Sequence, residues 1–347
     1  MAATFPSGSN TYVPEVTNKL VVDYSRNKDK FPLNQYVQIC PVTKQVGYYL
    51  EMTREEAGRI LNTDLKNFAW PDGADPPTHN DDTEGFEFKP YKTKRYSYGF
   101  NIGSLAVEQA AFNVVAHNAG VKAEQAMRAR TQMVVGAATT SGNYDATHVS
   151  AVASITGVTG KWDVSTTARK DIKRSLDYAA NKIIEDSLNG VASEDLILVI
   201  SLYTARLMSI SQEIVDMIKG SPEAYAEIRG ELPNRNIHFG LPNRLYGYKV
   251  VVEDSVKVTS KKGATKAVSG ILANTTAFMC SRVGGLVSTQ AAEAPSFTTH
   301  VLFMKEEMSV ESKSESWERR ERHRVVEDFQ AAVVGKIAGF LFTSVVS

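Results

Sequence analysis

The sequence predicts an α+β fold, in which helices and separate groups of strands share one chain of 347 residues. Three observations lead to this prediction. The stretch from Ser104 to Val135 contains no proline and a single glycine, which indicates one long helix. Across 86–100, aromatic residues recur with a period of two, which indicates strands. Between 163 and 305, short apolar runs alternate with amphipathic helical patterns, as in helices packed on a sheet.

The predicted helix 104–135 has a start and a stop signal. Ser104 belongs to the residue types that cap helix N-termini, and Gly136 to the type that ends helices. At ~1.5 Å per residue the helix would be roughly 48 Å long, whereas the mean in globular domains is about three turns. A helix of this length beside a strand hairpin favours a structural building block over an enzyme built around a pocket.

Composition excludes several classes of protein. Lys plus Arg is 39 and Asp plus Glu is 39, so the zero net charge argues against binding nucleic acid through overall charge, although not against a local basic face. No apolar run reaches the ~18 residues of a membrane span, and the N-terminus lacks a signal-peptide pattern. We therefore expect no membrane partner.

The residues that usually carry chemistry form no recognisable motif. Cys40 and Cys280 lie far apart and have no CxxC neighbour, and the six histidines form no HExxH or other metal spacing. The sequence also lacks GxSxG, P-loop and GxGxxG patterns. We expect no catalytic residue, no metal and no cofactor. A soluble α+β enzyme remains the alternative of a different class, which a deep pocket with convergent polar groups would favour.

Residues 1–41 and 42–100 suggest extended segments. The first range scatters apolar residues among prolines, which indicates an arm lying on another surface, with a mobile terminus as the alternative. The second range combines two strand signals with a Pro/Gly/Asp-rich tip. An isolated two-stranded ribbon is at best marginally stable in water, so its aromatic face must cover either its own domain or a neighbour.

Three stretches carry a family resemblance. YKTKRYSYGFNIGSLAVEQAAFNVV leads from an aromatic, basic strand into the long helix, and MRARTQMVVGAATTSG ends that helix in a small-residue turn. DLILVISLYTARLM, followed later by GLPNRLYGYKVVVEDSV, combines an apolar strand, a helix and a leucine–glycine–apolar strand pattern. In this order, over nearly the whole chain, they resemble the tailed-bacteriophage major capsid protein family, whose fold is shared with encapsulin shells.

The resemblance implies a phage-capsid fold made of four parts. They are an N-terminal arm at 1–41, an extended β-hairpin loop at 42–100, a peripheral domain at 101–162 and 306–347 that holds the spine helix 104–135, and an axial α+β domain at 163–305.

The resemblance also implies a function. The chain would be a major capsid protein that self-assembles into hexamers and pentamers of an icosahedral shell enclosing double-stranded DNA. Its partners would be copies of itself, a separate scaffolding protein, a portal and a cement or decoration protein. It would reside in the virion after assembly in the host cytoplasm. The alternative within the fold is an encapsulin-like nanocompartment, which encloses cargo enzymes instead of a genome.

Three groups of residues are the expected contact sites. The extended loop would lie across the adjacent subunit, or else fold back on its own domain. The mixed-sign run 311–324 would pair charges between capsomers, or else form a solvated face. The loop 233–244 would surround the capsomer axis. The expected contact residues of the extended loop are Phe86, Phe88, Lys92, Lys94, Arg95, Tyr96 and Tyr98. Those between capsomers are Glu315, Glu318, Arg319, Arg320 and Arg322. Those of the loop at the capsomer axis are Asn234, Arg235, Asn243 and Arg244.

Contact with packaged DNA is expected to be non-specific and salt-dependent. The helix residues Lys122, Arg128 and Arg130 could form a basic face for this contact, although an ordinary exposed helix face is the favoured interpretation of them.

Overall fold

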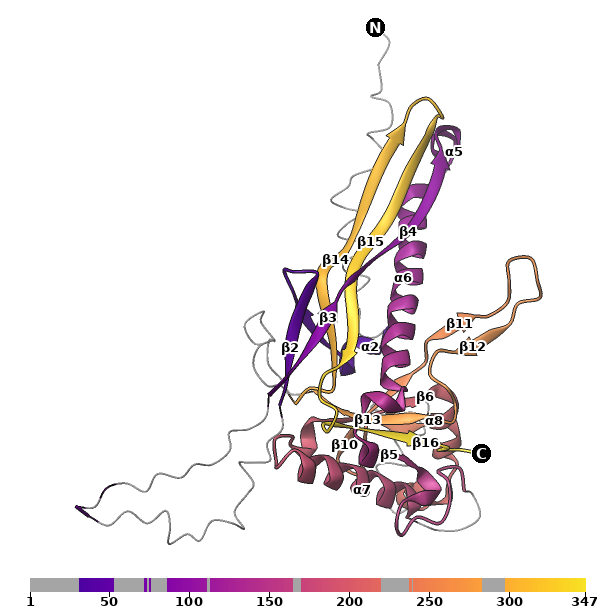
Figure 1. The fold of residues 1–347 in the computed structure, drawn as a ribbon. Coiled ribbons are helices and arrows are strands. Elements are labelled where there is room, and N and C mark those ends of the chain that lie inside the picture. Colours follow the sequence, from indigo (N-terminus) through magenta and orange to yellow (C-terminus); the bar gives the residue numbers. More distant parts are fainter. Residues whose placement is uncertain are drawn as a thin grey trace.

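In a computed structural model, the described part of the chain has two main sheets joined by one long helix (Figure 1). A long four-stranded sheet runs beside the helix, and a six-stranded sheet with its own helices lies at the base of that helix. The structure describes residues 31–52, 72–73, 75, 86–110, 113–164, 170–219, 237–238, 240–282 and 297–347.

The four-stranded sheet is centred on one long hairpin. Its strand order is β1-β14-β15-β4, with β1 parallel to β14 and the other neighbours antiparallel. The strands are β1 (Gln38–Pro41), β4 (Lys94–Gly103), β14 (His300–Glu315) and β15 (Arg320–Val333). The predicted charged segment 311–324 therefore belongs to the outer end of the β14–β15 hairpin.

The spine helix differs from its predicted bounds. A short helix, α5 (Ser104–Gln109), ends at Ala110, whose backbone is extended, and α6 (Val114–Ala138) begins afresh. The Asn113 side chain caps α6 by accepting a hydrogen bond from the backbone N–H of Ala116 at 2.9 Å. The prediction of one continuous helix over 104–135 was therefore wrong: the helix that begins at Ser104 ends at Gln109, and α6 runs on to Ala138. Gly136 lies inside α6, because packing of the flanking buried residues outweighs the roughly 1 kcal/mol helix cost of a glycine.

Small side chains let α6 approach the long sheet closely. Ala119, Ala123 and Ala126 are fully buried at helical spacing, and Met127 continues the same face. The sheet contributes the other half of this cluster, from residues on three strands: Tyr98, Phe100, Met308, Val310 and Val325.

The six-stranded sheet has the order β5-β16-β13-β6-β10-β9. Its members are β5 (Val149–Ala151), β6 (Leu196–Ser201), β9 (Arg244–Leu245), β10 (Tyr248–Glu253), β13 (Ala277–Ser281) and β16 (Gly339–Thr343). The apolar strand expected within DLILVISLYTARLM is confirmed as β6, every residue of which is buried. The helices of this half are α7 (Asp171–Asp186), α8 (Leu202–Ser209) and α9 (Gln212–Lys219).

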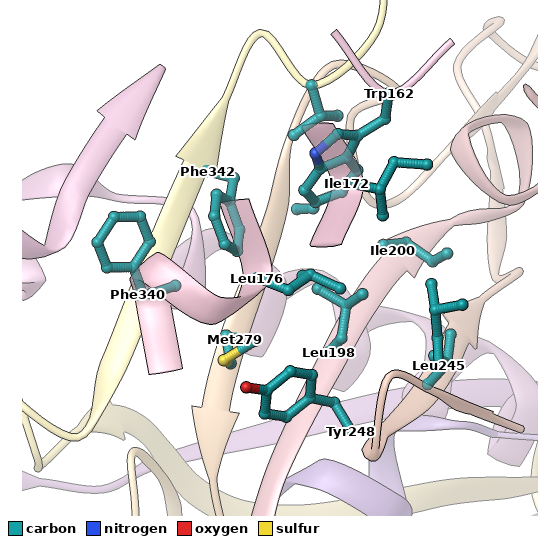
Figure 2. Packing of buried hydrophobic residues seen from close by; sticks show 14 of the residues in the cluster. Trp162, Ile172, Leu176, Leu198, Ile200, Leu245, Tyr248, Met279, Phe340 and Phe342 are labelled. Atoms are coloured by element: carbon teal, nitrogen blue, oxygen red, sulfur yellow. The ribbon is translucent and has the colours of Figure 1, made fainter. Parts of the chain in front are cut away.

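The core of this half lies between the sheet and α7. Trp162, Leu176 and Phe342 come from a loop, α7 and β16, and Figure 2 shows them converging with the side chains of β6. The indole N–H of Trp162 donates to the Ser175 hydroxyl at 2.8 Å, so the buried ring leaves its polar atom satisfied.

Part of the predicted N-terminal arm belongs to the core. Residues 1–30 lie outside the described residues, but Phe31, Leu33, Tyr36 and Cys40 are all buried. Phe31 lies in coil, Leu33 and Tyr36 lie in α2 (Leu33–Tyr36), and Cys40 lies in β1. Tyr36 donates a hydrogen bond to Glu253 of β10 at 2.9 Å, which ties α2 to the six-stranded sheet.

The strands of both sheets lie across the predicted domain limits, which stay a prediction. β14 begins at His300 within the long sheet, although 300–305 were expected in the axial domain. β16 pairs with β13, and β5 pairs with β16, so both strands belong to the six-stranded sheet. Both were expected in the peripheral domain. An apolar pattern reveals that a strand is buried, but it does not say which distant strand will be its neighbour.

Within the described residues, three two-stranded ribbons lie outside the two larger sheets. The antiparallel pairs are β2 (Val46–Met52) with β3 (Phe86–Lys92), and β11 (Val256–Val258) with β12 (Val268–Gly270). The predicted strand 86–100 is thus divided at Thr93, because β3 joins the ribbon and β4 joins the long sheet. A third, shorter pair is β7 (Ile237–His238) with β8 (Leu241–Pro242). Among the described helices, none is long and apolar enough to cross a membrane.

Candidate assembly surfaces

Charged side chains at the end of the β14–β15 hairpin pair with one another. The Glu315 carboxylate accepts a hydrogen bond from Nε of Arg320 at 2.9 Å and forms an ion pair with Nε of Arg322, also at 2.9 Å. Glu318 contacts the same two arginines. The hydrogen bond from Arg320 holds the pKa of Glu315 below its usual value. Four of the five residues predicted for contacts between capsomers are therefore paired within one chain, and their inter-capsomer role stays a prediction.

The hairpin turn presents two unusual residues. Arg319 has a φ of 46°, a left-handed conformation that closes the tight turn. Trp317 is 98% exposed. Tryptophan is enriched where protein surfaces meet, because a large rigid ring buries much area at small entropic cost. The tip thus has the chemistry of a protein contact.

A groove of about 360 Å³ lies on the hairpin near this end. Its lining is polar and comes from β4, β14 and β15: Ser97, Gly99, Asn101, Glu311, Ser312, Lys313, Glu315, Arg322, His323 and Arg324. The arginines and glutamates of this lining are engaged in the surface pairs of the hairpin. Within the described part of the chain, no group of three or more His, Cys, Asp or Glu side chains could hold a metal ion.

The β2–β3 ribbon has two different faces. On one face, Tyr91 stacks on Phe303 of β14 with ring centroids 4.6 Å apart, and Tyr49 stacks on the same ring at 5.6 Å. On the other face, Tyr48 and Phe88 are 63% and 68% exposed. The ribbon therefore covers its own domain with one face and leaves an aromatic surface open on the other.

The remaining residues predicted for the extended loop divide between ribbon and sheet. Phe86 begins β3, and its side chain lies outside the described residues. Tyr96 packs on Phe329 at 5.0 Å, and Tyr98 joins the cluster beneath α6, where burial raises its pKa to about 12. These two rings cover their own chain. The exposed members of the group are Phe88, Lys92, Lys94 and Arg95, the last of which pairs with Glu306 at 3.5 Å.

Half of the predicted axis loop can be placed. Asn243 directly precedes β9, and Arg244 is the first residue of that strand. The Arg244 side chain is exposed. The carbonyl of Asn243 accepts from the backbone N–H of Val250 at 2.8 Å, which holds the segment on β10. Asn234 and Arg235 lie outside the described residues.

The basic face predicted for the spine helix is not a continuous surface. Arg130 is buried at 2% exposure and pairs with the fully buried Glu327 of β15, Nε to Oε2 at 3.1 Å. Arg128 binds Glu124 at 2.6 Å, and its other terminal nitrogen donates to the Val256 carbonyl at 3.2 Å. Neither interpretation of this face, contact with DNA or an ordinary exposed helix face, holds for Arg130, because its guanidinium forms a structural ion pair inside the protein.

Sequence reasoning missed two buried carboxylates that organise this architecture. Glu327 is opposite Arg130, and burial raises its pKa while Arg130 opposes that shift. Glu213 of α9 accepts hydrogen bonds from the backbone N–H groups of Ile172 and Lys173 at 2.9 and 3.0 Å, and so caps α7 from another helix. The available signal was a charged residue inside an otherwise apolar periodic stretch.

These elements together define the major-capsid fold of tailed bacteriophages, which encapsulins share. The chain is similar to a phage-related protein from Bordetella bronchiseptica (14% identity, 94% of this chain and 97% of that one, TM-score 0.61). It is also similar to the mature capsid protein of bacteriophage PhiM1 (9% identity, 89% and 85%, TM-score 0.50). An encapsulin from Synechococcus elongatus matches equally well (10% identity, 90% and 86%, TM-score 0.51).

The resemblance noted in the sequence is thus confirmed at the level of the fold. The same fold occurs in the solved phage capsid and in the solved encapsulin named above. No protein-family model matches the chain, and the curated proteins contain no match in sequence.

Proposed function

We propose that the chain is a major capsid protein, which self-assembles into the hexamers and pentamers of an icosahedral shell around double-stranded DNA. The observation that carries the proposal is the likeness of fold, over 94% of this chain, to a phage-related protein. Its likeness to a mature phage capsid, over 89% of the chain, supports the same conclusion.

Exposed aromatic side chains on projecting elements support self-assembly. Trp317 lies at the end of the long hairpin, and Tyr48 and Phe88 lie on the open face of the β2–β3 ribbon. A monomer that exposes such rings gains free energy when a neighbour covers them. The ribbon, with Lys92, Lys94 and Arg95 at its base, would lie across the adjacent subunit. The hairpin end, with Arg319, would meet another capsomer, and the segment at Asn243 and Arg244 would surround the capsomer axis.

The partners follow from this role. The shell would need a separate scaffolding protein, a portal and a cement or decoration protein, and the finished chain would reside in the virion after assembly in the host cytoplasm. Contact with DNA would be non-specific and salt-dependent, with Lys122 and Arg128 of α6 as its candidates.

A nanocompartment shell is the second candidate, supported by the likeness to an encapsulin at TM-score 0.51. The two candidates share the assembly and differ in what the shell encloses. A nanocompartment would contain cargo proteins, and a capsid would contain double-stranded DNA.

The test is particle formation by the purified chain, expressed with and without its genomic neighbours. Light scattering and negative-stain microscopy are expected to show closed shells or capsomer rings. Nucleic acid inside the particles supports the capsid, and protein cargo supports the nanocompartment. A chain that remains a monomer or dimer with any scaffolding partner present contradicts both.

A further inference from the structure

The β11–β12 hairpin projects from the body of the protein. Figure 1 shows it extending to one side, beyond the base of α6. Its base is held by Arg128, whose guanidinium donates to the Val256 carbonyl at 3.2 Å, and its tip turns at Gly263, where φ is 88°. The base of the hairpin is therefore fixed to α6, whereas the residues around its tip are exposed to solvent.

One face of this hairpin is apolar and exposed. Val258 lies directly opposite Val268, and Val256 is two residues from Val258, so the three side chains share one face. They are 54%, 50% and 39% exposed, respectively. Two strands of three residues cannot maintain such a face alone in water. A partner that covers the valines would stabilise the hairpin.

The charged residues of this hairpin are all of one sign. Residues 255–270 contain four lysines and no acidic residue, although the whole chain has zero net charge. Lys261, Lys262 and Lys266 are exposed around the tip, and none of them has an ion pair within the described part of the chain. The partner should therefore be acidic as well as partly apolar.

The chain itself contains a segment of matching chemistry. Residues 71–85 carry five acidic residues and no lysine or arginine, together with three prolines and an alanine. The acidic residues are Asp72, Asp75, Asp81, Asp82 and Glu84. Asp72 and Asp75 belong to the described residues, and both positions are exposed.

We propose that the β11–β12 hairpin is the docking site for the acidic segment 71–85 of a neighbouring copy of this chain. The inference rests on the proposed function, because it specifies one of the subunit contacts that assembly requires.

The topology makes this contact intermolecular and directional. Figure 1 shows the β2–β3 ribbon, from which the acidic segment departs, and the β11–β12 hairpin on opposite sides of the long sheet and α6. The 33 residues between Met52 and Phe86 leave and rejoin one ribbon, so they can reach at most roughly 55 Å from it. Donor and acceptor surfaces on opposite sides of one subunit form a head-to-tail contact, which closes a ring when the rotation between copies permits.

A nucleic acid fits the hairpin less well than this segment does. Phosphates would satisfy the lysines, but a nucleic-acid backbone offers nothing apolar to cover Val256, Val258 and Val268. The segment 71–85 offers both carboxylates and prolines. Nucleic-acid binding by the hairpin is accordingly an outcome that the experiment must recognise.

The experiment uses two full-length charge-reversal variants. The hairpin variant is Lys261→Glu/Lys262→Glu/Lys266→Glu, and the loop variant is Asp81→Lys/Asp82→Lys/Glu84→Lys. Each alone is expected to lose at least tenfold in assembled capsomers by analytical ultracentrifugation, because like charges then face each other. An equal mixture is expected to assemble, because each variant's reversed surface meets a complementary surface on the other.

The control variant reverses three exposed lysines elsewhere, Lys170→Glu/Lys173→Glu/Lys219→Glu, and should assemble like the wild type. Normal assembly of the hairpin variant overturns the inference. If its particles also lack the nucleic acid of wild-type particles, judged from the absorbance ratio at 260 and 280 nm, the hairpin binds nucleic acid instead. Failure of the mixture to assemble also overturns the inference.

A disulfide measurement tests the contact directly. The full-length Asp82→Cys/Lys262→Cys variant is expected to form a ladder of covalent oligomers on oxidation, since both native cysteines are buried. Either single variant should give dimers at most. Absence of the ladder from wild-type-like capsomers refutes the docking site alone, whereas wild-type protein that never assembles refutes the proposed function.

Discussion

One of the buried histidines, His300, lies in surroundings that predict a pH-dependent stability of the fold. The Tyr144 hydroxyl donates to the Ala138 carbonyl at 2.8 Å, so the hydroxyl oxygen is left to accept from Nε2–H of His300 at 3.1 Å. The other ring nitrogen, Nδ1, is buried and has no hydrogen-bond partner. Tyr36 and Phe278 pack edge-on against the ring. Protonation would therefore place a charge in an apolar site.

We predict that His300 makes the fold less stable in acid. Burial lowers its pKa from 6.5 to about 3. Because the unfolded chain binds the proton more readily, this stability is complete above pH 6.5 and is lost as the pH falls toward 3. The free energy of unfolding should be about 2 kcal/mol lower at pH 5 than above pH 7 from this group alone. Urea unfolding of His300→Gln, which keeps an N–H donor, should lack that part of the slope; an unchanged slope contradicts the prediction.

A second prediction concerns the ion pair between α6 and β15. Arg130→Met should destabilise the fold by about 3–5 kcal/mol, because it leaves the buried Glu327 carboxylate without its partner. The double variant Arg130→Met/Glu327→Leu should recover most of this loss, since neither charge then remains buried. Chemical unfolding of the four members of this cycle measures the coupling. Equal losses in the single and double variants would show that the pair is unimportant.

Sequence reasoning at the residue scale succeeded where a pattern is local and failed where a partner is distant. The burial of Leu196–Ser201 could be predicted from an unbroken apolar run. The burial of Arg130 could not, because its carboxylate partner lies 197 residues away on another element. A charged residue inside an apolar stripe was the available hint, but a stripe alone does not reveal its counter-charge.

At the scale of elements, α6 depends on small residues facing the long sheet. Ala123 is fully buried there, whereas Val121 on the same helix is 49% exposed. We predict that Ala123→Leu destabilises the fold by about 1–3 kcal/mol, because added methyl and methylene groups force helix and sheet apart. Val121→Leu is the matched control and should change the free energy of unfolding by less than about 0.5 kcal/mol. Equal effects at both positions would mean that the close approach is not required.

The order and type of most elements could be predicted from sequence, but their bounds and neighbours could not. The short apolar runs expected between 163 and 305 correspond to β6, β10 and β13. The break between α5 and α6 was missed because residues 104–135 contain no proline. β16 was assigned to the other half of the molecule because its pairing with β13 is non-local, and residue patterns do not encode such pairing.

At the scale of the whole molecule, the most exposed aromatic side chains among the described residues lie on projecting elements. The open ribbon face at Tyr48 and Phe88 and the hairpin end at Trp317 occupy separate parts of the protein. A compact monomer would have little reason to place aromatic rings there, whereas a shell subunit must contact several copies at once. The candidate contact residues were therefore predictable in kind, as aromatic and charged residues on strands. Their pairing within one chain was not, because it depends on the β14–β15 register.

The last prediction separates assembly from folding at Trp317. Its ring is almost fully exposed, so Trp317→Ala should leave the free energy of unfolding within about 0.5 kcal/mol of the wild-type value. If the hairpin end contacts another capsomer, the same variant should lower the yield of closed particles, because truncating a buried interface tryptophan typically costs at least about 2 kcal/mol. The measurement is the ratio of shells to free capsomers by sedimentation, with Trp317→Phe as the conservative variant and Val121→Ala as the exposed control. Rescue by phenylalanine would identify the aromatic ring as the contact. Wild-type yields from Trp317→Ala would instead mean that the hairpin end stays in solvent and that the ribbon carries the subunit contacts.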